Sequence, residues 1–167
     1  MNGMSVFTSR KADMIAALDT YDTSIAYTDW FLQQLIEQAS TLQVPATVTY
    51  VPDHGEDLEL LDGRRGHGGP QYTQHAFEIP VFVWMNDAYR KAHPDKVAAL
   101  QGNSAKEIRS HNVFYTVADL MGITWTEAAP LESFASDKFA PDTTMRYIAG
   151  AGLVAREQQS QAPATVR

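Results

Sequence analysis

Apolar residues recur every three or four positions between residues 10 and 39, which is the spacing of one helix face. The pattern predicts one long helix, or two helices with a break near Tyr21, and Ser9 is the expected N-cap. We expect one apolar stripe of this helix to pack on a sheet. That stripe consists of Leu18, Ile25, Leu32 and Leu35.

Two short apolar runs follow, at residues 46–51 and 79–84, and both are rich in β-branched or aromatic residues. Runs of this length and composition predict buried strands. Pro80 belongs at the start or on an edge of the second strand, because proline has no backbone N–H to donate to a neighbouring strand. The intervening segment, residues 53–74, carries repeated glycine and predicts a loop.

Helical spacing returns at residues 110–121, with Ser110 as the expected cap and Gly122 as the expected end. Its expected core face consists of Val113, Phe114, Val117, Leu120 and Met121. The order helix, strand, polar loop, strand, helix predicts an α/β domain with a mainly parallel sheet over residues 1–155. The polar residues 156–167 predict a disordered tail.

Composition narrows the classes of function. The net charge of −7 and the sequence pI of about 5.1 argue against nucleic-acid binding, which needs a basic surface. The absence of cysteine excludes disulfides, thiolate metal sites and a cysteine nucleophile. No apolar stretch reaches the roughly 18–20 residues of a membrane span, and residues 1–5 lack the pattern of a signal peptide. Taken alone, the sequence predicts a soluble chain.

Metal chemistry is indicated where the first strand ends, at Asp53 and His54. Carboxylate and imidazole are both zinc ligands. Adjacent side chains of a regular strand point to opposite faces, so both can reach one ion only if the chain leaves the strand there. Gly55 permits that departure. A turn-capping aspartate beside a surface histidine is the alternative that the residue types leave open.

Five segments in order resemble the phosphoethanolamine transferases of the sulfatase and alkaline-phosphatase superfamily. They are residues 21–29 (YDTSIAYTD), 51–56 (VPDHGE), 67–70 (HGGP), 79–84 (IPVFVW) and 110–123 (SHNVFYTVADLMGI). The resemblance runs from about residue 12 to residue 153. It implies the C-terminal portion of an α/β/α sandwich, corresponding to the C-terminal half of that family's catalytic domain.

The resemblance also implies roles for individual residues. Asp53 and His54 would be ligands of Zn²⁺ or another divalent metal, and Glu56 would orient His54 from a second layer. His67 would hydrogen-bond a phosphoryl oxygen or act as a general acid. Gly68 would let the backbone approach the substrate. Ordinary surface-loop roles for these last three residues stay open.

The implied activity is transfer of phosphoethanolamine from phosphatidylethanolamine to a lipopolysaccharide (lipid A or core) or glucan acceptor. In that family the catalytic domain also has an N-terminal half, which follows transmembrane helices and supplies a threonine nucleophile and a metal-binding glutamate. The catalytic domain faces the periplasm from the inner membrane. Nothing in this sequence matches that half, so we expect the chain alone to be inactive. Two alternatives stay open: a phosphatase- or sulfatase-type hydrolase, and a non-catalytic chain that retains the fold.

Overall fold

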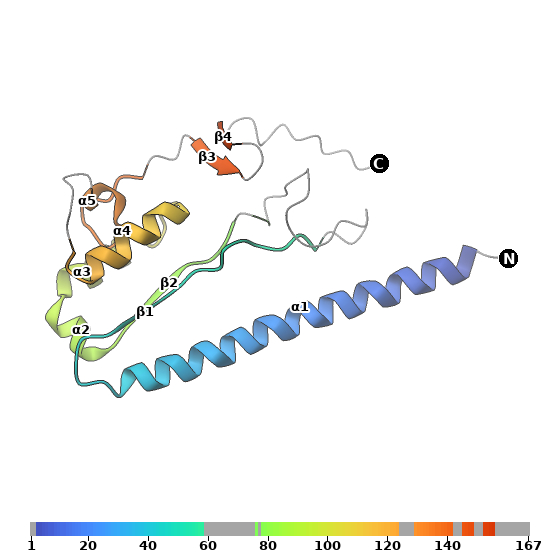
Figure 1. Cartoon of the computed structure of the whole chain (residues 1–167), viewed down its shortest axis with the longest axis horizontal. Coiled ribbons are helices and arrows are strands. Elements are labelled where there is room, and N and C mark those ends of the chain that lie inside the picture. The colour runs from blue at the N-terminus through green and yellow to red at the C-terminus, as the bar shows by residue number, and fades with distance from the viewer. Residues whose placement is uncertain are drawn as a thin grey trace. The chain divides into compact units, whose positions relative to one another are not determined.

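The computed structural model describes residues 3–58, 76, 78–123, 129–141, 145–148 and 152–155, with side chains for 13–58, 76, 78–123 and 129–141. The chain divides into two compact units, Met1–Asn86 and Asp87–Arg167. The first unit contains α1 (Gly3–Ser40), β1 (Thr47–Tyr50) and β2 (Phe82–Met85) (Figure 1). The second contains α2 (Asp87–Ala92), α3 (Pro94–Asn103), α4 (Ser110–Leu120), α5 (Ala129–Glu132), β3 (Met145–Ile148) and β4 (Gly152–Ala155). A single domain over residues 1–155 stays a prediction, and residues 156–167 lie outside the described residues.

Helix α1 is one continuous helix of 38 residues. It starts before Ser9, so the expected N-cap there is wrong, and it passes Tyr21 without a break. Hydroxyl groups in this polar stretch bond back to the helix: Thr20 Oγ1 donates to Ala16 O at 2.7 Å, and Thr23 and Ser24 make similar bonds. Such bonds to a carbonyl of the preceding turn satisfy the hydroxyl group inside a helix, although they slightly destabilise it. Among the described residues, no helix is both long enough and apolar enough to cross a bilayer.

The expected core stripe of α1 is only partly correct. Leu18 and Leu32 are half-buried, whereas Ile25 and Leu35 are exposed. Leu35 lies about 60° around the helix from Leu32, since each residue turns the helix by about 100°. Strand β1, which α1 contacts, is also short: four residues extend about 13 Å, against about 57 Å for the helix. Most of α1 therefore has no sheet beside it in the described part of the chain.

Strands β1 and β2 pair antiparallel, with Thr47 opposite Met85 and Tyr50 opposite Phe82. This corrects the expected mainly parallel sheet, and β3 and β4 also pair antiparallel. Parallel pairing requires the chain to cross back to the starting end of the sheet. Here the two arms stay together beyond Tyr50, because Gly55 N donates to Ala76 O at 2.9 Å. The strands are also less buried than expected, since only Val48 and Met85 are buried.

Asn86 fixes the connection between α1 and β1. Its buried side chain accepts a hydrogen bond from Ala46 N at 3.1 Å and donates to Leu42 O at 3.2 Å and Val44 O at 2.8 Å. Backbone groups in a turn need partners when water is excluded. One amide side chain therefore holds the turn against the end of the two-stranded sheet.

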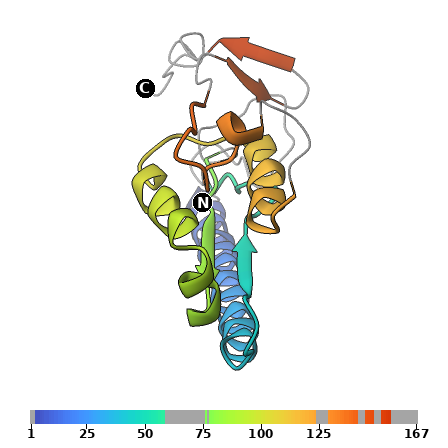
Figure 2. The same cartoon turned by 90° about the vertical axis from the view of Figure 1, so that its left-hand side faces the viewer.

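The expected core face of α4 is only partly correct, because Leu120 is buried and Val113 is half-buried but the other three residues are exposed. Asn112, Thr116 and Leu120 are buried, whereas Phe114 and Met121 are 65% and 69% exposed. Backbone groups of helix α5 and of the segment that follows it lie against the buried face of α4. Polar side chains of α4 form hydrogen bonds with these groups. Figure 2 shows α4 and α5 side by side.

The ends of α4 were predicted in part. Arg109 rather than Ser110 is the N-cap, and its N–H donates to Asn112 Oδ1 at 2.8 Å. Gly122 ends the helix as expected, with φ of 72°. That left-handed conformation favours glycine because a side chain would crowd the following carbonyl.

Candidate functional site

Asp53 and His54 lie together where the chain leaves β1. Asp53 Oδ2 is 3.6 Å from His54 Nε2, and His54 N donates to Asp53 Oδ1 at 3.1 Å. The Asp53 side chain is 88% exposed and that of His54 is 37% exposed. Both functional groups approach the same point because residues 51–56 are not in a regular strand.

The His54 ring is held by the next residue. Its Nδ1 lies 3.0 Å from Gly55 O, and a carbonyl oxygen can only accept, so Nδ1 carries the proton. In the neutral ring this leaves the Nε2 lone pair on the side of the Asp53 carboxylate. Metal-binding histidines commonly donate their other nitrogen to a carbonyl or carboxylate in this way.

The spacing of the two groups fits one divalent ion. Two ligand atoms at about 2.1 Å from a tetrahedral zinc lie roughly 3.4 Å apart. The observed separation of Asp53 Oδ2 and His54 Nε2 is 3.6 Å. Within the described residues, no set of three or more His, Asp or Glu side chains gathers closely enough to hold a metal. The pair thus offers two of the four ligands that a tetrahedral zinc takes.

The structure describes only some of the other predicted site residues. Glu56 is half-buried and Asp57 is buried, just after the Gly55–Ala76 hydrogen bond that fixes this loop. The orienting role of Glu56 stays a prediction. His67 and Gly68 lie outside the described residues.

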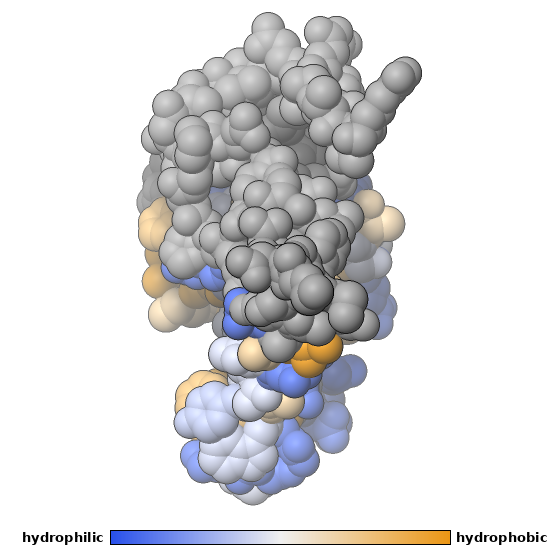
Figure 3. Space-filling model, turned by 90° about the vertical axis from the view of Figure 1, so that its right-hand side faces the viewer, coloured by the Kyte–Doolittle hydropathy of each residue, from blue (hydrophilic) through white to orange (hydrophobic). Residues whose placement is uncertain are grey.

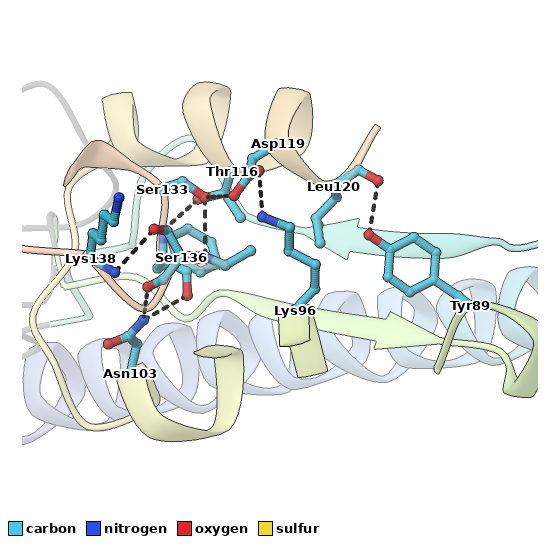
Figure 4. A network of polar contacts seen from close by, with 11 residues as sticks. Tyr89, Lys96, Asn103, Thr116, Asp119, Leu120, Ser133, Ser136 and Lys138 are labelled. Carbon is cyan, nitrogen blue, oxygen red and sulfur yellow. Dashed lines mark hydrogen bonds and ion pairs between the residues drawn. The ribbon is translucent and has the colours of Figure 1, made fainter. Parts of the chain in front are cut away.

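Sequence reasoning missed a partly buried polar network in the second unit, which Figure 4 shows. Lys96 Nζ donates to Asp119 Oδ1 at 2.6 Å, and Ser133 Oγ donates to Asp119 Oδ2 at 2.7 Å. Thr116 Oγ1 accepts from Phe134 N at 3.0 Å. Ser133 and Thr116 are fully buried, so their hydroxyls hold the segment after α5 rather than meet a substrate.

A signal for this network was present in α4. Asn112, Thr116 and Asp119 recur at the spacing of one helix face, and Asn112 Nδ2 donates to Glu132 O at 2.9 Å. A polar stripe through an apolar helix indicates buried hydrogen bonding as well as an exposed face. The nearby His111 Nε2 lies 2.8 Å from Glu132 Oε2 at a partly exposed position.

Tyr89 makes a separate hydrogen bond to the C-terminal end of α4. Its buried hydroxyl donates to Leu120 O at 2.8 Å. Burial raises the pKa of Tyr89 above its usual 10.0, and the carboxylates of Asp119 and Asp95 raise it further. The hydroxyl therefore keeps its proton, and its hydrogen bond, at neutral pH.

Comparison with known proteins identifies the family to which this chain is similar. The sulfatase family matches residues 4–123. The Kdo(2)-lipid A phosphoethanolamine 7''-transferase of Escherichia coli (strain K12) is 32% identical over 118 residues, or 68% of this chain and 20% of that protein. Phosphoethanolamine transferase EptA of Helicobacter pylori is 31% identical over 81 residues, or 46% of this chain and 15% of that protein. The chain thus spans about a fifth of the length of these relatives.

Comparison with solved structures agrees with the family match. The crystal structure of the C-terminal periplasmic domain of EcEptC from Escherichia coli superposes with a TM-score of 0.75 at 19% identity, over 87% of this chain and 42% of that one. The same domain in complex with Zn gives a TM-score of 0.66 at 20% identity, over 92% of this chain and 42% of that one. These neighbours confirm the α/β, sulfatase-like fold. The chain belongs to the sulfatase family, and its relatives include phosphoethanolamine transferases.

Proposed function

We propose that this chain supplies the Asp53–His54 metal-binding edge of a phosphoethanolamine transferase site. The geometry of that pair carries the proposal, since its two ligand atoms are 3.6 Å apart and one histidine tautomer is selected. The curated relatives support the transferase class by their names, and a structural neighbour was solved in complex with Zn.

Each residue has a defined task in this proposal. A divalent metal, when bound, supplies Lewis-acid activation of the nucleophile and neutralises charge on the phosphoryl oxygens. Asp53 and His54 hold it, and Gly55 O fixes the histidine ring. Glu56 orients His54, His67 hydrogen-bonds a phosphoryl oxygen or protonates the leaving group, and Gly68 gives the substrate room beside the backbone.

The proposed donor is phosphatidylethanolamine, and the proposed acceptor is a lipopolysaccharide or glucan. One relative is named for Kdo(2)-lipid A, and the structural neighbours are periplasmic domains, which supports a periplasmic site anchored at the inner membrane. Double displacement needs a hydroxyl nucleophile held in line with the phosphorus. We propose that a threonine and a further metal carboxylate come from a part of the enzyme outside these 167 residues.

Zinc binding tests the site. Titration of the metal-free chain with Zn²⁺, followed by calorimetry, should give one site that His54→Ala and Asp53→Asn each weaken by about tenfold or more. His93→Ala is the matched control, because His93 belongs to the second unit and its ring packs on Tyr89, with centroids 4.5 Å apart. Equal affinity for all four proteins would overturn the metal assignment.

Turnover tests the activity separately. Diacylglycerol release from a phosphatidylethanolamine analogue should be undetectable for the isolated chain. It should appear when the chain is joined to a nucleophile-bearing part, and His54→Ala should abolish it. Metal-dependent turnover by the 167 residues alone would contradict the need for an outside nucleophile.

A hydrolase is the second candidate, because the matching family is the sulfatase family. It would use the same metal ligands and pass the intermediate to water. Free phosphoethanolamine as the product, with none on an added lipid A acceptor, would favour this alternative.

A further inference from the structure

Two prolines mark the end of the ladder between β1 and β2. Tyr50 and Phe82 form the last pair of the ladder, and continuing its register would set Pro52 opposite Pro80. Neither proline has a backbone N–H, so neither can donate a hydrogen bond to the facing strand. Both arms leave the regular strand at this point (Figure 1).

The two prolines occupy positions at which the ladder needs both donors. Asn86 N donates to Ala46 O at 3.1 Å across the other end of the ladder, which identifies these two residues as a hydrogen-bonded pair. Hydrogen-bonded pairs recur at every second position of an antiparallel ladder. Counting by twos leads from Ala46 to Pro52 and from Asn86 to Pro80. The facing prolines therefore remove both bonds of one pair, and the ladder stops.

The two arms meet again at Gly55 and Ala76, one residue out of register. In the register of the ladder, Ala76 would lie opposite Glu56. Gly55 N makes the bond to Ala76 O instead, at 2.9 Å. Between the ladder and this bond, the second arm therefore uses one residue more than the first, as in a β-bulge.

This offset accounts for the approach of two adjacent side chains to one point. Neighbouring residues of a regular strand point to opposite faces. Asp53 and His54, which we call the metal pair, lie within the offset segment, and Asp53 Oδ2 is 3.6 Å from His54 Nε2. Surface hydropathy does not reveal this arrangement, since hydrophilic and apolar residues intermingle on the described surface in Figure 3. The backbone register does.

Gly55 connects the second arm to both side chains of the metal pair. Its N–H is held by Ala76 O, and its own carbonyl accepts a hydrogen bond from His54 Nδ1 at 3.0 Å. His54 N in turn donates to Asp53 Oδ1 at 3.1 Å, and the other oxygen, Oδ2, lies toward the histidine ring. A chain of hydrogen bonds thus runs from Ala76 to the two groups that would bind a metal.

We propose that Gly55 is a positioning residue of the metal pair, and that the facing prolines Pro52 and Pro80 keep the register offset in which it acts. Through its bond to the second arm, Gly55 holds its carbonyl against His54 Nδ1. The lone pair of His54 Nε2 is then turned toward the Asp53 carboxylate before any metal arrives. The proposal rests on the proposed metal-binding function of the pair, and it gives a role to three residues that contribute no ligand.

Replacing single backbone N–H groups by ester oxygens tests Gly55 in the full 167-residue chain. Glycolic acid in place of Gly55 removes the N–H that Ala76 O accepts and keeps every side chain. Lactic acid in place of Ala46 is the matched control. It removes an N–H that donates to Asn86 Oδ1 at 3.1 Å, at the opposite end of β1 from the metal pair.

The first readout is nitrogen-15 NMR of the metal-free chain at a pH of about 8.5, where a free imidazole is neutral. The His54 signals are assigned by their absence from His54→Ala. In the wild type the ring proton should lie on Nδ1. The Gly55 ester should move it toward Nε2, the preferred position in free histidine, and the Ala46 ester should not. A merely structural role of the Gly55 N–H would lower stability in both esters without moving this proton.

The second readout is zinc affinity by calorimetry. It should fall by about tenfold for the Gly55 ester, because Nε2 cannot bind a metal while it carries the proton. The Ala46 ester should change it less than twofold.

Restoring the missing donors tests the prolines. In the double variant Pro52→Val, Pro80→Val, the two new amide protons should be protected from exchange, because the ladder can continue. Zinc affinity should fall by about tenfold while the free energy of unfolding in urea does not fall, since the variant gains ladder bonds and loses the offset. Pro94→Ala is the control, because it restores an N–H at the start of α3, and it should leave zinc affinity within twofold.

The proposal is overturned if the Gly55 ester keeps the wild-type tautomer, or if the Ala46 ester changes the tautomer equally. It is also overturned if the new valine amides exchange as fast as in an unfolded chain, or if they are protected and zinc binds as tightly as to wild type. Failure of the proposed function would look different. The wild-type chain would then bind no zinc, while the tautomer of the metal-free chain would still decide whether Gly55 positions His54.

Discussion

The Asn103 side chain should stabilise the segment after α5 by an amount that can be calculated from its contacts. Asn103 is buried at the end of α3, and its Nδ2 donates to Phe134 O at 3.0 Å and to Ser136 O at 2.9 Å. Two carbonyls from one irregular segment thus depend on one amide (Figure 4). Asn103→Ala removes both donors and adds no replacement.

The expected cost is about 2–3 kcal/mol. Each lost hydrogen bond costs about 1 kcal/mol net, and a buried carbonyl left without a donor costs about 1–3 kcal/mol if water does not enter. Alanine returns about 0.5 kcal/mol because it favours the helix more than asparagine does. Since Asn103 is 7% exposed, we expect partial access of water and a result near the middle of the range.

Native-state amide hydrogen exchange measures this cost locally, which matters because the chain has two units and global unfolding need not be two-state. The reporters are Ala135 N, bound to Ser133 Oγ at 3.2 Å, and Lys138 N, bound to Ser136 Oγ at 3.1 Å. A loss of about 2–3 kcal/mol corresponds to exchange roughly 30–150 times faster. Gln101→Ala, exposed on the same helix, is the control. Acceleration below about threefold at both amides would refute the reasoning.

Three further changes test other contacts. Tyr89→Phe should lower stability by about 1 kcal/mol at pH 7. The pKa of Tyr89 is raised in the folded state, so the wild-type protein should lose stability as pH rises above 10.0. The variant lacks this hydroxyl, so its free energy of unfolding in urea should fall less over the same pH range. Parallel curves of that free energy against pH would contradict this. Gly122→Ala should cost about 1 kcal/mol from its φ of 72° alone, since an added Cβ meets no atom within 4 Å, and an unchanged melting temperature would refute it. Lys96→Met should cost about 1 kcal/mol at low salt and less in 1 M NaCl, because the Lys96–Asp119 pair is partly exposed; a cost independent of salt would point to packing instead.

Much of the fold could be predicted where a local signal was strong. The apolar spacing predicted α1 and α4, strand β1 lies inside its predicted run, and β2 begins inside the second run and ends one residue beyond it. Gly122 ends α4 as expected because its φ of 72° suits glycine above other residues. These features depend on residues close together in the chain, so the sequence carries them.

The errors have a common physical cause, which is that tertiary partners decide burial. Phe114 and Met121 suggested a core face, but the segment after α5 needed hydrogen-bond partners, and Thr116 is buried in their place. The predicted parallel pairing of the strands was wrong for a similar reason. Alternating helices and strands favour parallel pairing on average, whereas here Gly55 and Ala76 keep the two arms of β1 and β2 together.

At the candidate site, the sequence predicted which residues are adjacent but not how they are held. It could indicate that Asp53 and His54 share the end of a strand. It could not indicate that Gly55 O selects the His54 tautomer or that His54 N binds the Asp53 carboxylate, because both contacts depend on backbone angles after the strand. Their role as metal ligands stays a prediction.

The affinity of the proposed metal site depends on whether its ligand set is complete. Asp53 is 88% exposed and the described pair supplies two ligands, so zinc should bind the isolated chain weakly. If a nucleophile-bearing part of a sulfatase-type domain binds this chain and brings further ligands, it must raise the zinc affinity. Binding free energies are reciprocal, so zinc must then raise the affinity for that part by the same factor. A ratio of one in both titrations, with the two parts still bound to each other, would mean that the added part supplies no ligand to the metal.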